Sequence, residues 1–239
     1  SRTARGTSIV NLLPLQPDEK IQAVVDTRDY ETNRFLFFAT KSGRVKKTLF
    51  TAYDSSLKAG LIAIKLNDGD ELVSVAPTNG SDDLFLISSF GQTLRINETT
   101  VRPMGRTAAG VMGMKFRSAD NLVSCVVSRP DAMLLHLTDE GYGKRTSLEE
   151  FTTKGRGGLG VRGIKTTESR GSVAGALVVK EDDDILAVTS IGKIIRLGVS
   201  EISSQGRDAT GVRVMSLGDS ERITAISIAP TTVNDAEYL

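Results

Sequence analysis

The segment Thr152–Lys165, TTKGRGGLGVRGIK, contains four basic side chains among closely spaced glycines. Gly155, Gly157 and Gly160 have the G-x-G-x-x-G spacing of loops that bind the phosphates of a dinucleotide. Such a loop needs a strand before it and a helix after it, whereas the following VRGIKTTE aligns with strand-like segments elsewhere in the chain. No G-K-[ST] triplet follows the glycines. The G-x-G-x-x-G match is therefore interpreted as accidental, and the loop is not expected to be a nucleotide site.

Residues that could carry out catalysis are few and isolated. The single histidine, His136, lies in MLLHLT, a strand-like segment, and has no Cys or His companion at metal-ligand spacing. Asp182, Asp183 and Asp184 are consecutive, so in an extended chain their side chains point in alternating directions and form a solvated acidic turn. The single cysteine, Cys125, lies in LVSCVVS and is expected to be a buried thiol. We expect no catalytic site, metal site or cofactor here.

The chain repeats about every fifty residues. The segments 39–48, 87–96, 137–146 and 188–197 each contain [ST]-x-x-G between apolar runs. This pattern predicts a β-hairpin with a type I turn and a G1 bulge, in which glycine takes the left-handed conformation. The hydroxyl three residues before the glycine is expected to cap the turn. The glycines are Gly43, Gly91, Gly141 and Gly192, and the capping residues are Thr40, Ser88, Thr138 and Thr189.

Two further strand-like elements follow each hairpin. The first has a G-[VL] start and occurs at 59–66, 109–116, 159–166 and 210–217, with a fifth copy at 5–12. The second occurs at 20–26, 71–77, 121–127, 172–179 and 222–229. An all-β, propeller-like disc of four-stranded blades explains these phased copies, whereas one irregular β-sandwich does not. We expect a domain over 1–230 that starts partway through a blade, and a short acidic tail at 231–239.

Composition is that of an ordinary globular protein of 239 residues with a formal net charge of +1. No apolar run approaches the roughly 20 residues of a membrane span, and no signal peptide is visible. The lone cysteine favours a reducing, cytoplasmic location. Because the chain does not begin with Met, we expect it to be a fragment of a longer protein.

Basic residues are concentrated in one phase of the repeat. The windows 41–66, 92–117, 143–165 and 193–213 hold 21 Lys and Arg against 6 Asp and Glu, whereas the rest of the chain holds 9 against 23. A single lysine-rich stretch is ordinarily a solvated loop, but equal phase in a disc of blades means equal position in space. The repeat therefore predicts a positive band, with acidic turns such as 68–71 and 181–184 elsewhere. The residues expected to bind DNA in this band are Arg44, Lys46, Lys47, Lys58, Lys65, Arg95, Arg102, Arg106, Lys115, Lys144, Arg145, Lys154, Arg156, Gly157, Gly158, Arg162, Lys165, Lys193, Arg196, Arg207 and Arg213.

A periodic positive band is suited to a long, regular polyanion, and duplex DNA is the leading candidate. Aromatic residues are only 5% of the chain and Trp is absent, so stacking platforms for single strands are not expected. We expect contacts to the backbone of bent duplex DNA without base readout. The alternative is a propeller that serves as a protein-interaction scaffold, which predicts an exposed apolar or mixed patch and weak dependence on salt.

Several runs resemble the C-terminal domain of the DNA gyrase A protein. They are IVNLLPLQPDEKI, VKKT, AIKLNDGDELVSV, VRPMG, EGYGKRT, EEFTTKGRGGLGV and VSEIS, and the resemblance covers about residues 5–230. The related domain of topoisomerase IV is a weaker match. The resemblance implies a β-pinwheel, a disc with strands exchanged between blades, that wraps duplex DNA around a basic rim.

The same resemblance implies a place in a larger machine. The rest of the gyrase A protein and the gyrase B protein are the implied partners, and ATP-dependent negative supercoiling is the implied activity of the holoenzyme. The DNA-cleaving tyrosine and the ATP site of the family lie outside this domain, so the isolated domain is not expected to be an enzyme. We expect a monomeric, cytoplasmic, chromosome-associated domain without a membrane contact.

The family hallmark Q-R-R-G-G-K-G, in the first of usually six blades, is absent from this chain. In its place, residues 154–160 read K-G-R-G-G-L-G, which matches the hallmark at Arg156, Gly157, Gly158 and Gly160 but departs from it at Lys154, Gly155 and Leu159. The loop thus resembles a degenerate second copy in a later blade. It is expected to anchor DNA through Arg156 and the Gly157–Gly158 backbone. A flexible interblade loop is the alternative.

Overall fold

The four predicted hairpins form the centres of four antiparallel sheets. The computed structural model describes residues 15, 19, 21–25, 32–54, 60–117 and 119–229. The hairpin strands are β1 (Phe35–Thr40) and β2 (Arg44–Leu49), β4 (Asp83–Ser88) and β5 (Gln92–Asn97), β8 (Met133–Thr138) and β9 (Tyr142–Ser147), and β12 (Asp184–Thr189) and β13 (Ile194–Gly198). We name the four sheets blades A, B, C and D in this order.

The hairpin turns have the predicted geometry. Gly43, Gly91, Gly141 and Gly192 have φ angles of 82°, 80°, 81° and 79°. Each glycine N–H donates to the carbonyl three residues earlier, at 2.9 to 3.1 Å. The hydroxyl caps the turn in three blades, where Thr40, Ser88 and Thr138 accept from the backbone N–H four residues on at 3.1 to 3.3 Å.

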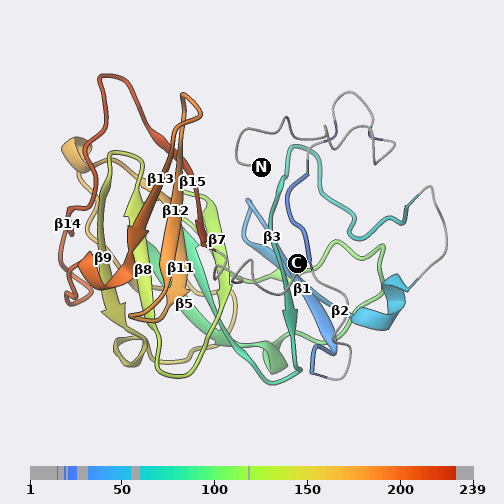
Figure 1. Ribbon diagram of the computed structural model, residues 1–239. Helices are drawn as coiled ribbons and strands as arrows, with labels where there is room; N and C mark the ends of the chain where they lie inside the picture. The colour runs from blue at the N-terminus through green and yellow to red at the C-terminus, as the bar shows by residue number, and fades with distance from the viewer. Residues whose placement is uncertain are drawn as a thin grey trace, which may run out of the picture.

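The inner strand of each blade is the last strand of its own repeat. These strands are β3 (Leu72–Thr78), β7 (Leu122–Val127), β11 (Val173–Val179) and β15 (Ile223–Ile228), and each pairs with the first hairpin strand of its blade. Consecutive inner strands contact one another from β3 to β7 to β11 to β15. The blades therefore stand side by side in an arc around these strands, as Figure 1 shows.

In blades A, B and C the outer strand comes from the next repeat. β6 (Val111–Met112) pairs with β2, β10 (Val161–Arg162) with β5, and β14 (Val212–Arg213) with β9. The fold class is confirmed as an all-β, propeller-like array with exchanged strands. Blade D has three strands in the described part of the chain.

The extent of the outer elements differs from the prediction. Each outer strand is only two residues long. The described residues 60–66 of the corresponding first copy form no strand, and no hairpin strand in the described part of the chain pairs with them. Residues 21–25 also form no strand. The copy at 5–12 and the tail at 231–239 lie outside the described residues.

Short 3-10 turns connect the hairpins to the outer strands. They are η2 (Phe50–Tyr53), η3 (Glu98–Thr100), η4 (Leu148–Glu150) and η6 (Val199–Glu201), while η5 (Glu168–Arg170) precedes β11. Each of the first four buries its first residue, so the turn fixes where the chain leaves its blade.

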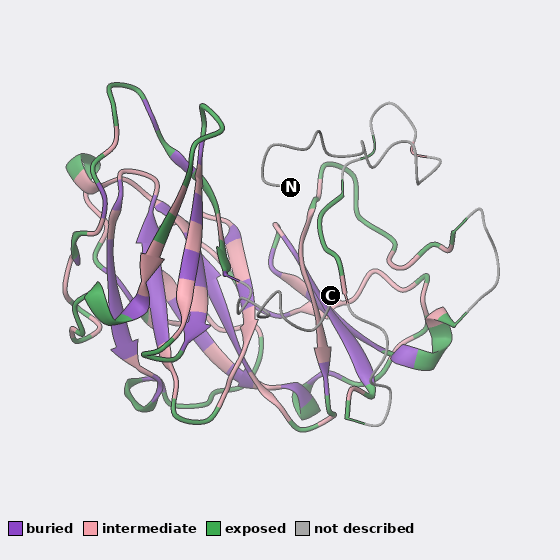
Figure 2. Ribbon diagram, in the orientation of Figure 1, coloured by how far each residue is buried: buried purple, intermediate pink, exposed green. Residues whose placement is uncertain are grey.

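The core lies between the blades. In blades B and C the residues of the first hairpin strand alternate between two neighbouring blades, because side chains in a strand point to opposite faces. Leu84 and Leu86 of β4 pack against Phe37 of blade A, whereas Phe85 on the other face packs against Leu134 of blade C. Most of the buried residues in Figure 2 accordingly lie on strands, and most of the exposed residues lie in the connecting loops.

His136 and Cys125 have the structural positions expected from the sequence. His136 on β8 is fully buried, and its Nε2 lies 3.0 Å from Thr93 Oγ1 of blade B. Burial, with a smaller contribution from the nearby Lys144, lowers the pKa of His136 to about 3. Cys125 on β7 is buried, and burial raises the pKa of its thiol to about 12.

Gly160 shows why a glycine stands at the start of the outer element in its repeat. Its φ is 74°, and a Cβ atom at this position would lie 2.6 Å from the carbonyl oxygen of Thr93 on β5. Glycine is required here both by the left-handed backbone and by the close approach of two chain segments. Gly155, in the same loop, has no atom within 4 Å of such a Cβ.

We predict that Gly160→Ala destabilises the fold and that Gly155→Ala does not. The left-handed conformation alone costs an alanine about 1–2 kcal/mol, and the contact with Thr93 adds to this cost. Chemical denaturation of the two variants measures the difference. Equal unfolding free energies for the two variants would contradict the close packing of this strand on β5.

Candidate nucleic-acid interface

Three loops cover the outer edges of blades A, B and C. These edge loops, residues 101–110, 151–160 and 202–211, run beside the second hairpin strand of the preceding blade. In each, one backbone N–H donates to the carbonyl of a basic residue on that strand. The bonds are Met104 to Lys47 at 2.7 Å, Lys154 to Arg95 at 2.9 Å, and Gln205 to Arg145 at 2.8 Å. The part of each repeat that is rich in Lys and Arg thus includes the outer edge of the blade.

Three lysines mark the junctions between successive outer edges. Lys65, Lys115 and Lys165 are fifty residues apart and exposed. The backbone N–H of each donates to the next edge loop, at Ala108, Gly158 and Ala209 respectively. None of the three ammonium groups has an ion-pair or hydrogen-bond partner within the described ranges. They form a regular row of unpaired positive charges, which we call the lysine row.

A second row of cations lies on the edge loops. Each loop contains a Gly-Arg pair, at Gly105-Arg106, Gly155-Arg156 and Gly206-Arg207. In the first and third loops the arginine is the second residue of a turn closed by an N–H bond of 3.2 Å, from Ala108 to Gly105 and from Ala209 to Gly206. We call these three residues the arginine row.

Most of the residues predicted to bind DNA reach the surface. The exposed ones are Lys65, Arg102, Lys115, Lys154, Arg156, Arg162, Lys165, Lys193, Arg196 and Arg213, and the partly exposed ones are Arg44, Arg95, Arg106, Gly157, Gly158 and Arg207. Lys58 lies outside the described residues. Several of these cations are engaged within the protein: Arg44 donates to the carbonyls of Ala109 and Gly110, and Arg213 to the hydroxyl of Tyr142.

Four of the predicted residues are buried, which argues against phosphate contact by Lys46, Lys47, Lys144 and Arg145 in this conformation. Lys47 donates to the carbonyl of Glu98 at 2.9 Å, and Arg145 to that of Ile202 at 2.6 Å. Arg95 makes the same kind of bond, to Leu148 at 3.2 Å. Each acceptor is on or beside the 3-10 turn of the next blade. These cations therefore hold neighbouring blades together.

The buried Lys47 also has a buried carboxylate partner. Its Nζ lies 3.4 Å from Oε2 of Glu98, and neither side chain is appreciably exposed. Glu98 accepts further hydrogen bonds from the Thr78 hydroxyl and the backbone N–H groups of Gly80 and Asp82, at 2.8 to 2.9 Å. Both carboxylate oxygens thus have donors, as burial of charge requires.

Lys46 and Lys144 occupy one position of the repeat, three residues after the hairpin glycine. Lys46 donates to the carbonyls of Ala63 and Arg106. Lys144 donates to those of Gly206 and Arg207, at 2.5 and 3.0 Å. Burial, and secondarily the charge of Arg106, lowers the pKa of Lys46 to about 8. Burial likewise lowers the pKa of Lys144 to about 8, although Glu150 and Asp208 act in the opposite direction.

The glycine-rich loop is packed on blade B. The Gly157 N–H donates to the carbonyl of Gly113 at 2.5 Å. The sequence had suggested that this N–H binds phosphate, but in the structure it is already engaged within the protein. Arg156 donates to the carbonyls of Thr100 and Met112, at 3.2 and 3.1 Å. Gly158 accepts from the Lys115 N–H at 2.9 Å. The loop therefore has fixed contacts with the neighbouring chain, unlike the flexible interblade loop that was the alternative.

The acidic turns are less separate from the basic band than the sequence suggested. Asp184 lies 2.7 Å from Arg196, and Glu181 lies 3.9 Å from Arg145. On the rim itself, Asp208 pairs with Arg162 at 3.2 Å. Asp70, from the other acidic turn, instead accepts from the hydroxyl and N–H of Ser42 in the hairpin turn of blade A. Within the described ranges no cluster of three or more His, Cys, Asp or Glu could hold a metal ion.

Two basic residues near the rim were not among the predicted binders. Arg170 lies over the ring of Tyr142, 4.7 Å from its centre, and donates to the carbonyl of Gly211 at 2.5 Å. Arg117 is exposed two residues after Lys115. Arg117 lies inside one of the basic windows, so the charge pattern could have identified it, whereas Arg170 lies outside all of them.

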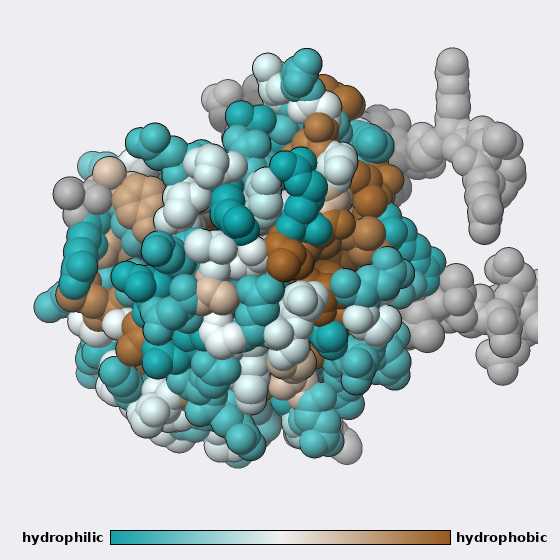
Figure 3. Space-filling model, turned by 90° about the vertical axis from the view of Figure 1, so that its left-hand side faces the viewer, coloured by the Kyte–Doolittle hydropathy of each residue, from teal (hydrophilic) through white to brown (hydrophobic). Residues whose placement is uncertain are grey.

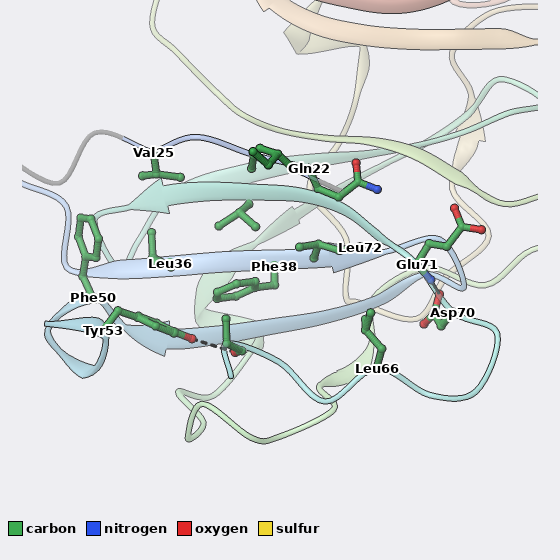
Figure 4. A pocket seen from close by; sticks show the side chains of 14 residues that line it. Gln22, Val25, Leu36, Phe38, Phe50, Tyr53, Leu66, Asp70, Glu71 and Leu72 are labelled. Atoms are coloured by element: carbon green, nitrogen blue, oxygen red, sulfur yellow. Dashed lines mark hydrogen bonds between the residues drawn. The ribbon is translucent and has the colours of Figure 1, made fainter. Parts of the chain in front are cut away.

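The two ends of the array are apolar. Blade A carries a groove of about 800 Å³ lined by side chains that include Leu36, Phe38 and Tyr53 (Figure 4). At the other end, blade D exposes Ile191 and Ile194. Figure 3 views the molecule from the left-hand side of Figure 1 and shows hydrophobic side chains gathered mainly to the right of centre within a largely hydrophilic surface.

Blades that exchange their outer strands define a propeller-type class of protein, and comparison with known proteins identifies the family. The model for "DNA gyrase C-terminal domain, beta-propeller" matches residues 34–79, 82–129, 132–180 and 183–230, one match for each blade. The DNA gyrase A protein of Salmonella typhimurium is 45% identical over 237 residues, which are 99% of this chain and 27% of that protein. The chain belongs to the DNA gyrase A C-terminal domain family.

Solved structures agree with this assignment. A gyrase A C-terminal domain superposes with a TM-score of 0.84 at 30% identity, covering 95% of this chain and 76% of the other. A topoisomerase IV C-terminal domain superposes with a TM-score of 0.85 at 29% identity, covering 93% and 70%. The chain spans about a quarter of the length of the curated relatives it matches. In the described part of the chain we find no helix with the length and apolarity to span a bilayer.

The buried lysines predict a distinctive pH dependence of stability. The pKa of Lys144 is lowered from 10.5 to about 8 by folding. Between these pH values the unfolded chain keeps a proton that the folded chain has released, so this group's contribution to the free energy of unfolding rises with pH. The melting temperature of the unaltered chain relative to Lys144→Met should therefore increase from pH 7 to pH 10. Lys193→Met, at an exposed position, controls for loss of a charge, and parallel curves for the chain and Lys144→Met would contradict the assignment.

Proposed function

We propose that this chain binds duplex DNA along its outer edges and bends it around the arc of blades. The lysine row carries the proposal: Lys65, Lys115 and Lys165 occupy the same position in the first three of the four repeats, are exposed and have no described partner. A row of positive charges at equal intervals suits the regular phosphates of a duplex, and each neutralised phosphate releases condensed counterions. Arg102, Lys154 and Lys193 add exposed positive charge in the same phase of the repeat.

The proposed contacts are to the DNA backbone rather than to base edges. The outer edges consist of two-residue strands and edge loops, and among the described residues there is no α-helix that could enter a major groove. Phosphate contacts fix position without reading sequence. Bending a site of 20–30 base pairs costs on the order of 1–6 kcal/mol, which contacts repeated on several blades can offset.

Within the longer protein, we propose that this domain presents wrapped DNA to the rest of gyrase. Family membership supports a place in the gyrase A protein beside the gyrase B protein, and a contribution to ATP-dependent negative supercoiling. We propose that the domain needs no cofactor, is not itself an enzyme, and acts as a monomer on the chromosome in the cytoplasm. The equal superposition on a topoisomerase IV domain makes a place in that enzyme the nearest alternative.

A protein-interaction scaffold is the alternative from another class. It predicts an exposed apolar patch, and blade A does carry an apolar groove that includes Leu36 and Phe38. The residues one repeat later in blade B, Leu84 and Leu86, are buried against blade A. The groove therefore has the character of a stacking face between repeats, and the lysine row favours DNA as the ligand.

We predict that removing the lysine row weakens DNA binding and its salt dependence together. Each phosphate contact contributes about 0.9 to the slope of log affinity against log salt. The triple variant Lys65→Ala, Lys115→Ala, Lys165→Ala should therefore lose up to about 2.7 from the slope, as measured by fluorescence anisotropy with a labelled duplex. The loss of slope should be the same for DNA duplexes of unrelated base sequence.

The matched control replaces three cations that the structure buries or pairs within the protein. Lys47→Met, Arg145→Met and Arg196→Met remove the same number of charges, and we expect them to lower the melting temperature while leaving most of the slope intact. Absence of binding to duplex DNA even at low salt would overturn the proposed function. An unchanged slope in the lysine-row variant would place the DNA elsewhere.

A further inference from the structure

Two buried lysines support the turns that carry the arginine row. The ammonium of Lys46 donates to the carbonyl of Arg106, and that of Lys144 to the carbonyls of Gly206 and Arg207. In both cases the acceptor belongs to the Gly-Arg turn of an edge loop from the next repeat. We propose that Lys46 and Lys144 are positioning residues that fix these turns so that Arg106 and Arg207 face the DNA.

Burial makes these lysines unsuited to touching DNA but well suited to holding backbone. Both have 0% exposure. A buried ammonium must satisfy its donors within the protein, and both lysines do so with carbonyls. Lys144 additionally donates to the Thr146 hydroxyl at 3.2 Å, while Lys46 donates to Ala63 and lies 5.1 Å from the centre of the Phe38 ring. Each turn carbonyl is thus tied to a strand in the interior of a blade.

Blade B provides a natural comparison, because it has Leu94 at the position of these lysines. Its edge loop therefore has a leucine beneath it in place of an ammonium, and Gly158 lies against that leucine. There the loop's own Arg156 donates to the backbone carbonyls of Thr100 and Met112. In blade B, which has Leu94 in place of the buried lysine, the side chain of Arg156 binds backbone carbonyls.

Where the lysine is present, the arginine is left available. The guanidinium of Arg106 has no hydrogen-bond or ion-pair partner in the described part of the chain. That of Arg207 has one long ion pair, with Glu150 at 3.9 Å. The buried lysines bind carbonyls of the Gly-Arg turn itself, whereas Arg156 in blade B spends its guanidinium on the carbonyls of Thr100 and Met112. Accordingly, Arg106 should contribute more than Arg156 to DNA binding.

The inference rests on the proposed function and can be tested separately from it by a double-mutant cycle. The chain, Lys46→Leu, Arg106→Ala and the double variant are compared by the slope of log affinity for a labelled duplex against log salt, well below each melting temperature. Leucine is the residue that the fold itself uses at this position in blade B. Arg106→Ala should lower the slope by about 0.9, Lys46→Leu by a similar amount, and the double variant by no more than either alone.

Lys193→Leu is the matched control, since it removes an exposed lysine from another blade. Combined with Arg106→Ala it should act additively, with a loss of about 1.8 from the slope. Additive losses for Lys46→Leu and Arg106→Ala would overturn the proposal, because Lys46 would then act through its own charge. A Lys46→Leu variant that melts earlier but keeps the slope would also overturn it, since the lysine would then only stabilise the fold.

A second cycle, with Lys144→Leu and Arg207→Ala, keeps the proposal testable if Lys46→Leu does not fold. The same non-additivity is expected, and additivity in this cycle would overturn the proposal. Failure of the unaltered chain to bind duplex DNA would be recognised at the first step and would sink the proposed function itself, together with this inference.

Discussion

The structure depends on pairing the outer edges of blades A, B and C with chain from the next repeat. A hairpin strand with an open edge leaves its backbone groups without partners. Here a two-residue strand and an edge loop supply those partners, and a basic side chain reaches across to the next 3-10 turn. Lys47, Arg95 and Arg145 perform this task in three successive blades. Since each of these blades borrows its edge from the next repeat, the array is held together by backbone and charge as well as by apolar packing.

This arrangement divides the basic residues of one phase between two tasks. Cations on the two faces of a second hairpin strand, such as Lys46 and Lys47, are buried and bind backbone carbonyls. Cations on the edge loops and at the junctions have solvent on one side and remain available. Lys144 and Lys165 are both basic and both belong to the same window, yet one is buried under a turn and the other is exposed on the rim.

Much of the fold could be predicted from the sequence. The spacing of Gly43, Gly91, Gly141 and Gly192 predicted four hairpins, and their positive φ angles confirm the turn type. The burial of Lys46 and Lys47 was not predicted, because a charge count by phase does not distinguish the faces of a strand. Their place in RVKKTL, on a strand buried on both faces, contained that information. The role of Arg156 and the Gly157 N–H was not predictable from the hallmark match, since it depends on which carbonyls the neighbouring blade brings within reach.

The most direct test of DNA wrapping is whether the arc imposes a handed path on DNA. Nicked plasmid is mixed with increasing amounts of the chain, ligated and freed of protein, and the topoisomers are separated on a gel. A rim that wraps DNA along the rows of successive blades predicts a change in linking number of one sign that grows with the amount of chain bound. Tight binding of the same plasmid without any change in linking number would contradict wrapping around the blades.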